Sequence, residues 1–324
     1  MAKVLRLQGL SFREELDGKA IRFQDSIVYL ALIPWEFCNW ECQYCHEEQR
    51  RKEPGELTLQ EMVGIVREGG ALGIRTLLLL GGEILLRNTW EITQQVVKEA
   101  FDQGLITLIY TNGSQMTEEM AEWLASHNVS LAFKVDSLQP DVYDRLSQRQ
   151  GSFESTMRAV QIARKTSIGQ VVYENGREKL VRLLFTTVGN ALNVEEYVSL
   201  ARFATNHGAR WMMEALNHRG DAATHPGLAL SLKDHSEAMR LAMLLNPEQQ
   251  HTFQLPCRLF SCVTIRKKGA VGVCPQDYAF VGNIRELGSL KAACDVIKAR
   301  VMHDQWRASW NGVCPIKANH FVTE

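Results

Sequence analysis

Short apolar runs alternate with longer amphipathic segments over about residues 27–215, and this alternation constrains the fold more than any other feature. Continuous apolar runs of this length are typical of parallel strands that are buried on both faces. Six strand-and-helix units predict an α/β fold with a right-handed parallel sheet, and because eight units close a full barrel, six indicate a partial (β/α)6 TIM-like barrel. The expected strands are Ile27–Ile33, Thr76–Leu80, Leu105–Tyr110, Ser130–Val135, Leu180–Thr187 and Arg210–Glu214.

The segments between these strands carry helix start signals, in which a capping residue is followed three positions later by a glutamate. Gly69-Gly70 predicts the end of the first helix, and a later helix is expected over about 232–245. The three capping pairs are Thr58 with Glu61, Asn88 with Glu91, and Asn193 with Glu196.

Three cysteines lie within eight residues directly after the first strand, as Cys38-x3-Cys42-x2-Cys45. A loop this short cannot pair three thiols as disulfides, and three thiolates leave a tetrahedral zinc ion one ligand short. Three thiolates can bind three irons of a [4Fe–4S] cluster and leave the fourth iron open. The alternative is a zinc knuckle completed by His46, which would require strained chelation by two adjacent residues.

This spacing, with the aromatic Tyr44 before the last cysteine, resembles the signature of the radical S-adenosylmethionine (SAM) enzymes. The resemblance implies that the open iron binds the amino and carboxylate groups of SAM, and that Tyr44 lies against the adenine. It also implies that Gly81-Gly82-Glu83, which follows the second strand, approaches the SAM ammonium. Many relatives have proline at the position of Ile84, so the chain departs from the family pattern there.

Three further residues at strand ends are candidates for the same site. Lys134 ends the fourth strand, where it is expected to contact a SAM carboxylate or ribose. The alternative for this lysine is a surface salt bridge with Asp136 or Asp141. Asn112 and Glu214 are weaker candidates, because both can be ordinary turn or strand-end residues.

A second group of thiols lies near the end of the sequence. The segment 257–274 predicts a β-hairpin with its turn at Lys267-Lys268-Gly269, and its pattern resembles the twitch or SPASM extensions of the same superfamily. That resemblance implies an auxiliary [4Fe–4S] cluster, with a zinc site or inert buried thiols as the alternatives. Cys294 is expected to be a buried free thiol, and donation of hydrogen to a substrate radical is its alternative role. The expected cluster ligands are Cys257, Cys262, Cys274 and Cys314.

Charge and hydropathy narrow the classes of partner. Lys and Arg number 36 against 37 Asp and Glu, so no global basic field favours nucleic acid. The clusters Arg50-Arg51-Lys52 and Arg266-Lys267-Lys268 are interpreted as solvated loop charges. Since neither a membrane-spanning run nor a signal peptide is present, a cytoplasmic protein is expected.

The sequence predicts three parts of the chain. We expect an N-terminal extension (1–26), the partial barrel (27–225) and the auxiliary-cluster domain with its β-hairpin and helix (226–324).

The resemblance implies an enzyme that cleaves SAM to a 5′-deoxyadenosyl radical and abstracts hydrogen from its substrate. We expect a small polar biosynthetic substrate of the amino-sugar or nucleoside type, a dehydrogenation or redox rearrangement, and an electron donor such as flavodoxin or ferredoxin. One alternative is a maturase that crosslinks or epimerises a ribosomally made peptide, although only some 25 residues precede the first strand. The other alternative is a non-catalytic redox sensor that holds an iron–sulfur cluster or zinc.

Overall fold

The computed structural model describes residues 27–47, 54–174, 177–247, 249, 262–276 and 278–303. Its main sheet has the strand order β11-β10-β9-β1-β2-β3-β4-β7-β8. The six expected strands are present and parallel, which confirms the α/β fold with a partial barrel. They are β1 (Tyr29–Ile33), β2 (Thr76–Leu79), β3 (Ile106–Thr111), β4 (Val129–Lys134), β7 (Leu183–Gly189) and β8 (Arg210–Ala215).

The predicted hairpin is confirmed, and it extends the barrel sheet. Strand β9 (Cys262–Arg266) pairs with β10 (Ala270–Gly272) in antiparallel fashion, and β10 pairs with β11 (Gly282–Asn283). The sequence did not indicate that β9 would also pair with β1, in parallel register from Tyr29↔Cys262 to Ile33↔Arg266. The C-terminal hairpin therefore lies beside the first strand. A separate antiparallel pair is formed by β5 (Val172–Glu174) and β6 (Arg177–Leu180).

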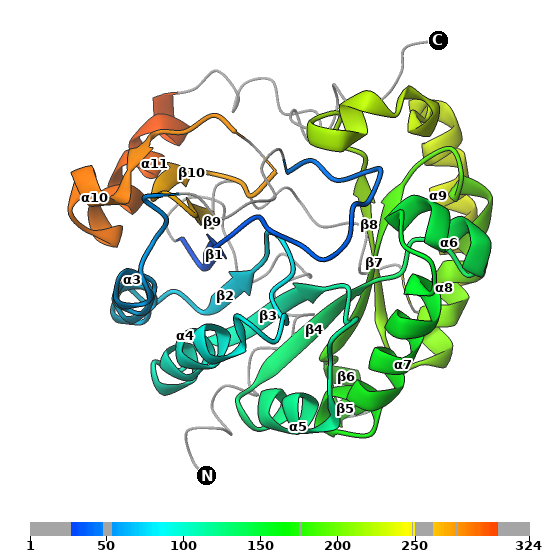
Figure 1. The fold of residues 1–324 in the computed structure, drawn as a ribbon, viewed down its shortest axis with the longest axis horizontal. Helices are drawn as coiled ribbons and strands as arrows, with labels where there is room; N and C mark the ends of the chain where they lie inside the picture. The colour runs from blue at the N-terminus through cyan, green and yellow to red at the C-terminus, as the bar shows by residue number, and fades with distance from the viewer. Residues whose placement is uncertain are drawn as a thin grey trace.

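Helices line the outer side of the curved sheet, with α10 and α11 beside β9 and β10 (Figure 1). Within the described ranges, none of the helices combines the length and apolarity needed to cross a bilayer. Short 3-10 turns occupy Ser167–Gly169 (η1), Val194–Glu196 (η2), Gly220–Thr224 (η3) and Pro226–Leu228 (η4). The α-helices are α3 (Leu59–Ala71), α4 (Trp90–Asp102), α5 (Glu118–Ser126), α6 (Pro140–Ser147), α7 (Ser152–Arg164), α8 (Tyr197–Asn206), α9 (Leu232–Leu245), α10 (Ile284–Leu287) and α11 (Leu290–His303).

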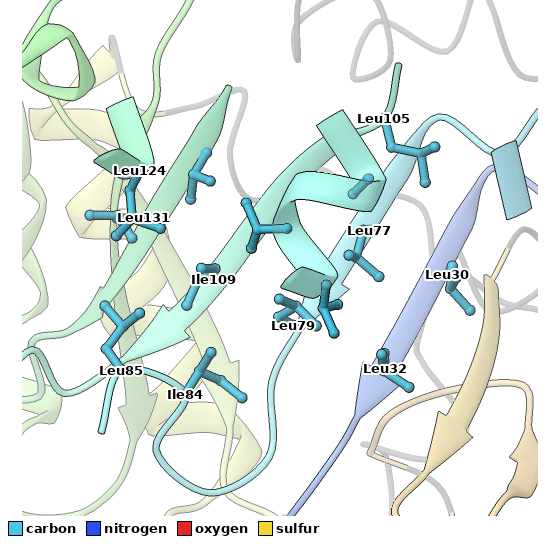
Figure 2. Packing of buried hydrophobic residues seen from close by; sticks show 14 of the residues in the cluster. Leu30, Leu32, Leu77, Leu79, Ile84, Leu85, Leu105, Ile109, Leu124 and Leu131 are labelled. Atoms are coloured by element: carbon cyan, nitrogen blue, oxygen red, sulfur yellow. The ribbon is translucent and has the colours of Figure 1, made fainter. Parts of the chain in front are cut away.

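Alternate residues of each strand pack into two apolar layers. Leu30 and Leu32 of β1 belong to the large core cluster, as do Leu77 and Leu79 of β2 (Figure 2). The intervening Ala31 packs in a smaller cluster on the opposite face of the sheet. Full burial of each such leucine is worth about 2 kcal/mol, which explains why β1 and β2 are almost entirely apolar.

Some predicted helix boundaries are wrong, and packing explains why. Helix α3 begins at the Thr58 capping box as expected but continues through Gly69 and Gly70 to Ala71. A Cβ atom at Gly70 would lie 2.6 Å from Cβ of Gln103, at the end of α4, so this glycine permits close helix packing.

Two of the expected capping hydrogen bonds do not form. Helix α4 is preceded by Thr89 rather than Asn88, and no side chain caps it. Asn193 does precede η2, which leads into α8, but its side chain donates to the carbonyl groups of Asp136 and Val188, because these buried acceptors need a partner. The fifth strand of the barrel begins at Leu183, since Leu180 belongs to β6.

Candidate functional site

The carboxyl ends of the barrel strands surround a cavity of about 220 Å³. The three thiols of the cysteine loop line it, together with the predicted SAM-contacting residues and both weaker candidates. Two positions from the C-terminal hairpin region, Pro275 and Gln276, close another side. The sequence-predicted residues that line this cavity are Cys38, Cys42, Tyr44, Cys45, Gly81, Gly82, Glu83, Asn112, Lys134 and Glu214.

The glycines after β2 lie directly against the cysteine loop. The amide of Gly82 donates to the carbonyl oxygen of Trp35, and the amide of Glu83 donates to that of Phe37, both at 3.0 Å. Gly81 has φ +133°, and a Cβ atom there would lie 2.4 Å from the Trp35 carbonyl oxygen. The need for glycine therefore comes from contact between the two loops, and the same backbone also faces the cavity.

Glu83 connects the ends of β2 and β3 inside the protein. Its carboxylate accepts the Thr111 hydroxyl at 2.6 Å and the amides of Leu85 and Asn112 at 2.7 Å. Burial raises the pKa of Glu83, and these donors oppose the shift. The neighbouring Ile84 is fully buried in the core (Figure 2).

Asn112 holds the start of the cysteine loop. Its amide nitrogen donates to Oδ1 of Asn39 at 3.0 Å and reaches the Cys38 sulfur at 3.8 Å. The Asn39 amide nitrogen in turn donates to the Ser114 hydroxyl at 2.8 Å. The turn after β3 therefore positions the first thiol.

Lys134 forms the predicted ion pair, although in a buried setting. Its ammonium lies 3.7 Å from Oδ1 of Asp136, whose side chain is only 2% exposed. Burial raises the pKa of Asp136 and the lysine charge opposes that rise. The ammonium also lies 5.2 Å from the ring centre of Tyr44. Lys134 and Tyr44 thus form one wall of the cavity.

The thiol set fits an iron–sulfur cluster by its chemistry. Burial is the largest cause that raises the pKa of the Cys42 thiol, and the Cys38 and Cys45 thiols raise it further. Among the described residues, no three or more His, Cys, Asp or Glu side chains converge tightly enough to enclose one metal ion. A cube spreads its ligands over different irons, so its thiolates need not converge on one point. Three soft sulfur donors that line one cavity match that requirement.

The second thiol group is described only in part, since Cys257 and Cys314 lie outside the described residues. Cys262 begins β9, and burial raises its pKa to about 12. The hairpin register pairs Val271 with Ile265 and Gly272 with Thr264, which when continued places Cys274 opposite Cys262. Neither of these two thiols lines the cavity. Cys294 in α11 is buried in the apolar core, and burial raises its pKa to about 11.

Charged residues on either side of the cysteine loop were missed by the sequence reasoning. Glu36 and Glu47 are 8% and 4% exposed, and the loop lies between them. Arg266 and Lys267, interpreted from the sequence as solvated, are also buried. The only sequence signal was the placement of one acidic residue two positions before Cys38 and another two positions after Cys45.

Comparison with known families places this geometry in context. The family model described as "Radical SAM superfamily" matches residues 32–204, which is more than half of the chain. The match begins at Leu32, near the end of β1, ends within α8, and includes the cysteine loop and the glycines after β2.

Similar proteins share only part of this chain's length. The chain is 31% identical over 139 residues to the AdoMet-dependent heme synthase of Methanosarcina barkeri, which covers 41% of this chain and 39% of that protein. It is 28% identical over 167 residues to the GTP 3′,8-cyclase of Haemophilus influenzae, 48% of each chain. The solved structure of native anSMEcpe with bound AdoMet and a Kp18Cys peptide has the same fold, with a TM-score of 0.63 and 14% identity over 84% of this chain and 82% of that one. This chain thus spans less than half the length of these curated relatives.

Proposed function

The chain belongs to the radical SAM superfamily, and we propose that Cys38, Cys42 and Cys45 hold a [4Fe–4S] cluster beside a SAM molecule in the cavity. One observation carries the proposal: the three thiols, the glycines after β2 and Lys134 all line the same cavity. When bound and reduced, the cluster would supply the electron for cleavage of SAM to methionine and a 5′-deoxyadenosyl radical, which would abstract hydrogen from a substrate C–H bond.

The chain's own residues orient SAM and exclude water. Backbone groups of Gly81 and Gly82 receive the SAM ammonium, and Glu83 keeps their loop in place. Lys134 contacts the SAM carboxylate or ribose, because its ammonium faces the cavity while Asp136 anchors it. The adenine lies near Tyr44. Apolar lining residues such as Leu78, Leu80 and Val188 limit access of water to the reacting centre.

We further propose that the substrate is a small polar molecule of the amino-sugar or nucleoside type. The Glu214 carboxylate at the cavity wall suits the amino or hydroxyl groups of such a molecule. The similarity to a GTP 3′,8-cyclase supports a nucleoside-type substrate over the peptide alternative.

An auxiliary [4Fe–4S] cluster is proposed to bind the substrate or to accept an electron from the product radical. Its proposed ligands are Cys257, Cys262, Cys274 and Cys314. A ferredoxin or flavodoxin is the proposed electron donor.

Anaerobic reconstitution tests the proposed cofactors. The wild-type protein should contain about eight irons if both clusters form, or about four if only the first does. Cys38→Ala should lose the first cluster and all 5′-deoxyadenosine formation, whereas Cys262→Ala should lose the auxiliary cluster alone. Cys294→Ala is the matched control and should keep both. A colourless protein that binds zinc alone would contradict the proposal.

Turnover separates an enzyme from a sensor. With dithionite and SAM, the reconstituted enzyme should release 5′-deoxyadenosine, and a redox sensor would release none. Candidate amino sugars, nucleosides and short peptides labelled with deuterium then identify the substrate class by transfer of deuterium to 5′-deoxyadenosine. Transfer from a peptide alone would favour the maturase alternative.

A further inference from the structure

Two acidic side chains lie on either side of the cysteine loop, and one arginine contacts both. Nη1 of Arg266 lies 3.1 Å from Oε2 of Glu47 and 3.5 Å from Oε1 of Glu36. All three side chains are less than 10% exposed. Because Glu36 precedes Cys38 by two residues and Glu47 follows Cys45 by two, a single guanidinium joins the two ends of the loop.

The strand register puts this arginine where the loop begins. Arg266 is the last residue of β9 and pairs in register with Ile33, the last residue of β1. The chain enters the cysteine loop directly after Ile33. The pairing of β9 with β1 therefore places a cation from the C-terminal hairpin at the base of the loop.

Further contacts fix the guanidinium in one orientation. Its Nη2 donates to the Pro275 carbonyl oxygen at 2.6 Å, and its central carbon lies 4.0 Å from the ring centre of Tyr278. The Tyr278 hydroxyl lies 3.0 Å from both Oε2 of Glu47 and the carbonyl oxygen of His46. Tyr278 therefore contacts the arginine with its ring and the end of the cysteine loop with its hydroxyl.

The local charges balance. Lys267 lies 2.9 Å from Oε2 of Glu36, so two cations face two carboxylates. Loss of the arginine would leave two buried carboxylates near one lysine, and a buried unpaired charge is strongly unfavourable.

We propose that Arg266 is a positioning residue that holds both ends of the cysteine loop in the conformation that receives the cluster. The identity of that cluster rests on the proposed function, but the closure of the loop does not. A lysine could not replace this arginine, because one ammonium cannot match the planar fork that contacts two carboxylates and a carbonyl group.

The test compares Arg266→Met with Arg285→Met. Arg285 is a matched control, since it also links the C-terminal region to the N-terminal half, by contacts to Glu61 and to the carbonyl groups of Gly55 and Glu56, but it does not touch the cysteine loop. The first readout is the rate at which iodoacetamide alkylates Cys38 and Cys45 in the apo-protein, followed by mass spectrometry. Arg266→Met should raise this rate at least fivefold, and Arg285→Met should leave it unchanged.

The second readout is the cluster itself. Arg266→Met should bind less than half the wild-type iron at the first site, and the cluster that does form should have a more negative midpoint potential because a nearby positive charge is lost. The iron content of Arg266→Lys should lie between that of the wild type and that of Arg266→Met. A purely structural role would lower the melting temperature without moving the potential of the remaining cluster.

A second variant covers the case in which Arg266→Met fails to fold. The double variant Glu47→Gln/Arg266→Met keeps the Lys267–Glu36 pair and removes one charge of each sign. It should fold, and it should still show fast alkylation and low iron content, because the link between the loop ends is gone. If the folded Arg266 variants show the same alkylation rates and iron content as the wild-type protein, the proposal is wrong. Wild-type protein that takes up no iron would instead contradict the proposed function.

Discussion

A Cβ atom at Gly82 would lie 1.9 Å from the carbonyl oxygen of Phe37. The loop after β2 and the cysteine loop are therefore in direct backbone contact, and no larger residue fits between them. This contact joins the cysteine loop and the glycines after β2 into one unit. The stability of the thiol loop and the shape of the SAM cavity consequently depend on the same few backbone atoms.

Gly82→Ala should separate these loops. We expect a loss of about 2–3 kcal/mol in the free energy of unfolding, since the obstructing atom is backbone that cannot rotate away, together with reduced iron content. Gly64→Ala is the control, because Gly64 lies within α3 and nothing beyond its chain neighbours and the helix's own backbone lies within 4 Å of the added Cβ. It should stabilise the protein by about 0.5–1 kcal/mol. Urea unfolding measures both, and equal effects would contradict the loop contact.

Glu83→Gln should destabilise the protein by about 2 kcal/mol. The substituted amide presents an N–H₂ group to positions that now face the Thr111 hydroxyl and two backbone amides, so a buried donor loses its acceptor. Glu118→Gln provides the comparison, because Glu118 is 67% exposed and pairs with the exposed Lys165. Its effect in urea unfolding should stay below about 0.5 kcal/mol. A Glu83→Gln protein as stable as wild type would show that the carboxylate is dispensable.

The Glu61–Arg285 pair should make stability depend on pH. Hydrogen bonds from Arg285 are the largest cause that lowers the pKa of Glu61, to about 2. A lowered folded-state pKa stabilises the protein above the unfolded value of about 4.3, and that contribution is lost as the pH falls towards 2. Arg285→Met should therefore cost up to about 1 kcal/mol at pH 7, discounted for the exposure of both side chains. The difference in the free energy of unfolding between Arg285→Met and the wild type, measured in urea, should shrink between pH 5 and pH 2. A difference that stays constant over this range would contradict the role of the Glu61–Arg285 pair.

Lys134→Met should weaken SAM binding about tenfold, equivalent to about 1.4 kcal/mol. The substitution removes the cation at the cavity wall and leaves the buried Asp136 without the ammonium that lies 3.7 Å away. Lys165→Met is the control, because Lys165 is 69% exposed and lies outside the cavity. Isothermal titration of the reconstituted protein with SAM measures the change. Unaltered affinity in Lys134→Met would remove this lysine from the proposed SAM site.

Local patterns predicted most of the fold. The Thr58 capping box set the start of α3, and the expected helix over 232–245 matches α9. These signals work because capping bonds and apolar periodicity involve residues only a few positions apart. The cysteine spacing pointed to the candidate site for the same reason, since three thiols within one short loop cannot lie far from one another.

Residues whose partners are distant in sequence were read incorrectly. Gly69-Gly70 resembled a helix stop, whereas Gly70 makes room for Gln103. Asn193 resembled a helix cap, but its amide satisfies buried carbonyl groups on other elements. In each case a tertiary contact replaced the local interaction that the sequence pattern favoured.

By itself the sequence determined the alternating α/β order, the thiol loop and its position at the carboxyl end of the first strand, because periodicity and spacing are written along the chain. Only the tertiary structure decided that β9 pairs with β1, and that Arg266 reaches Glu36 and Glu47 across 230 and 219 positions. The edge of a parallel sheet accepts any strand with a compatible register. The pairing of β9 with β1 therefore depends on packing around the whole barrel. The burial of Arg266 and Lys267, which the sequence suggested were solvated, follows from that pairing.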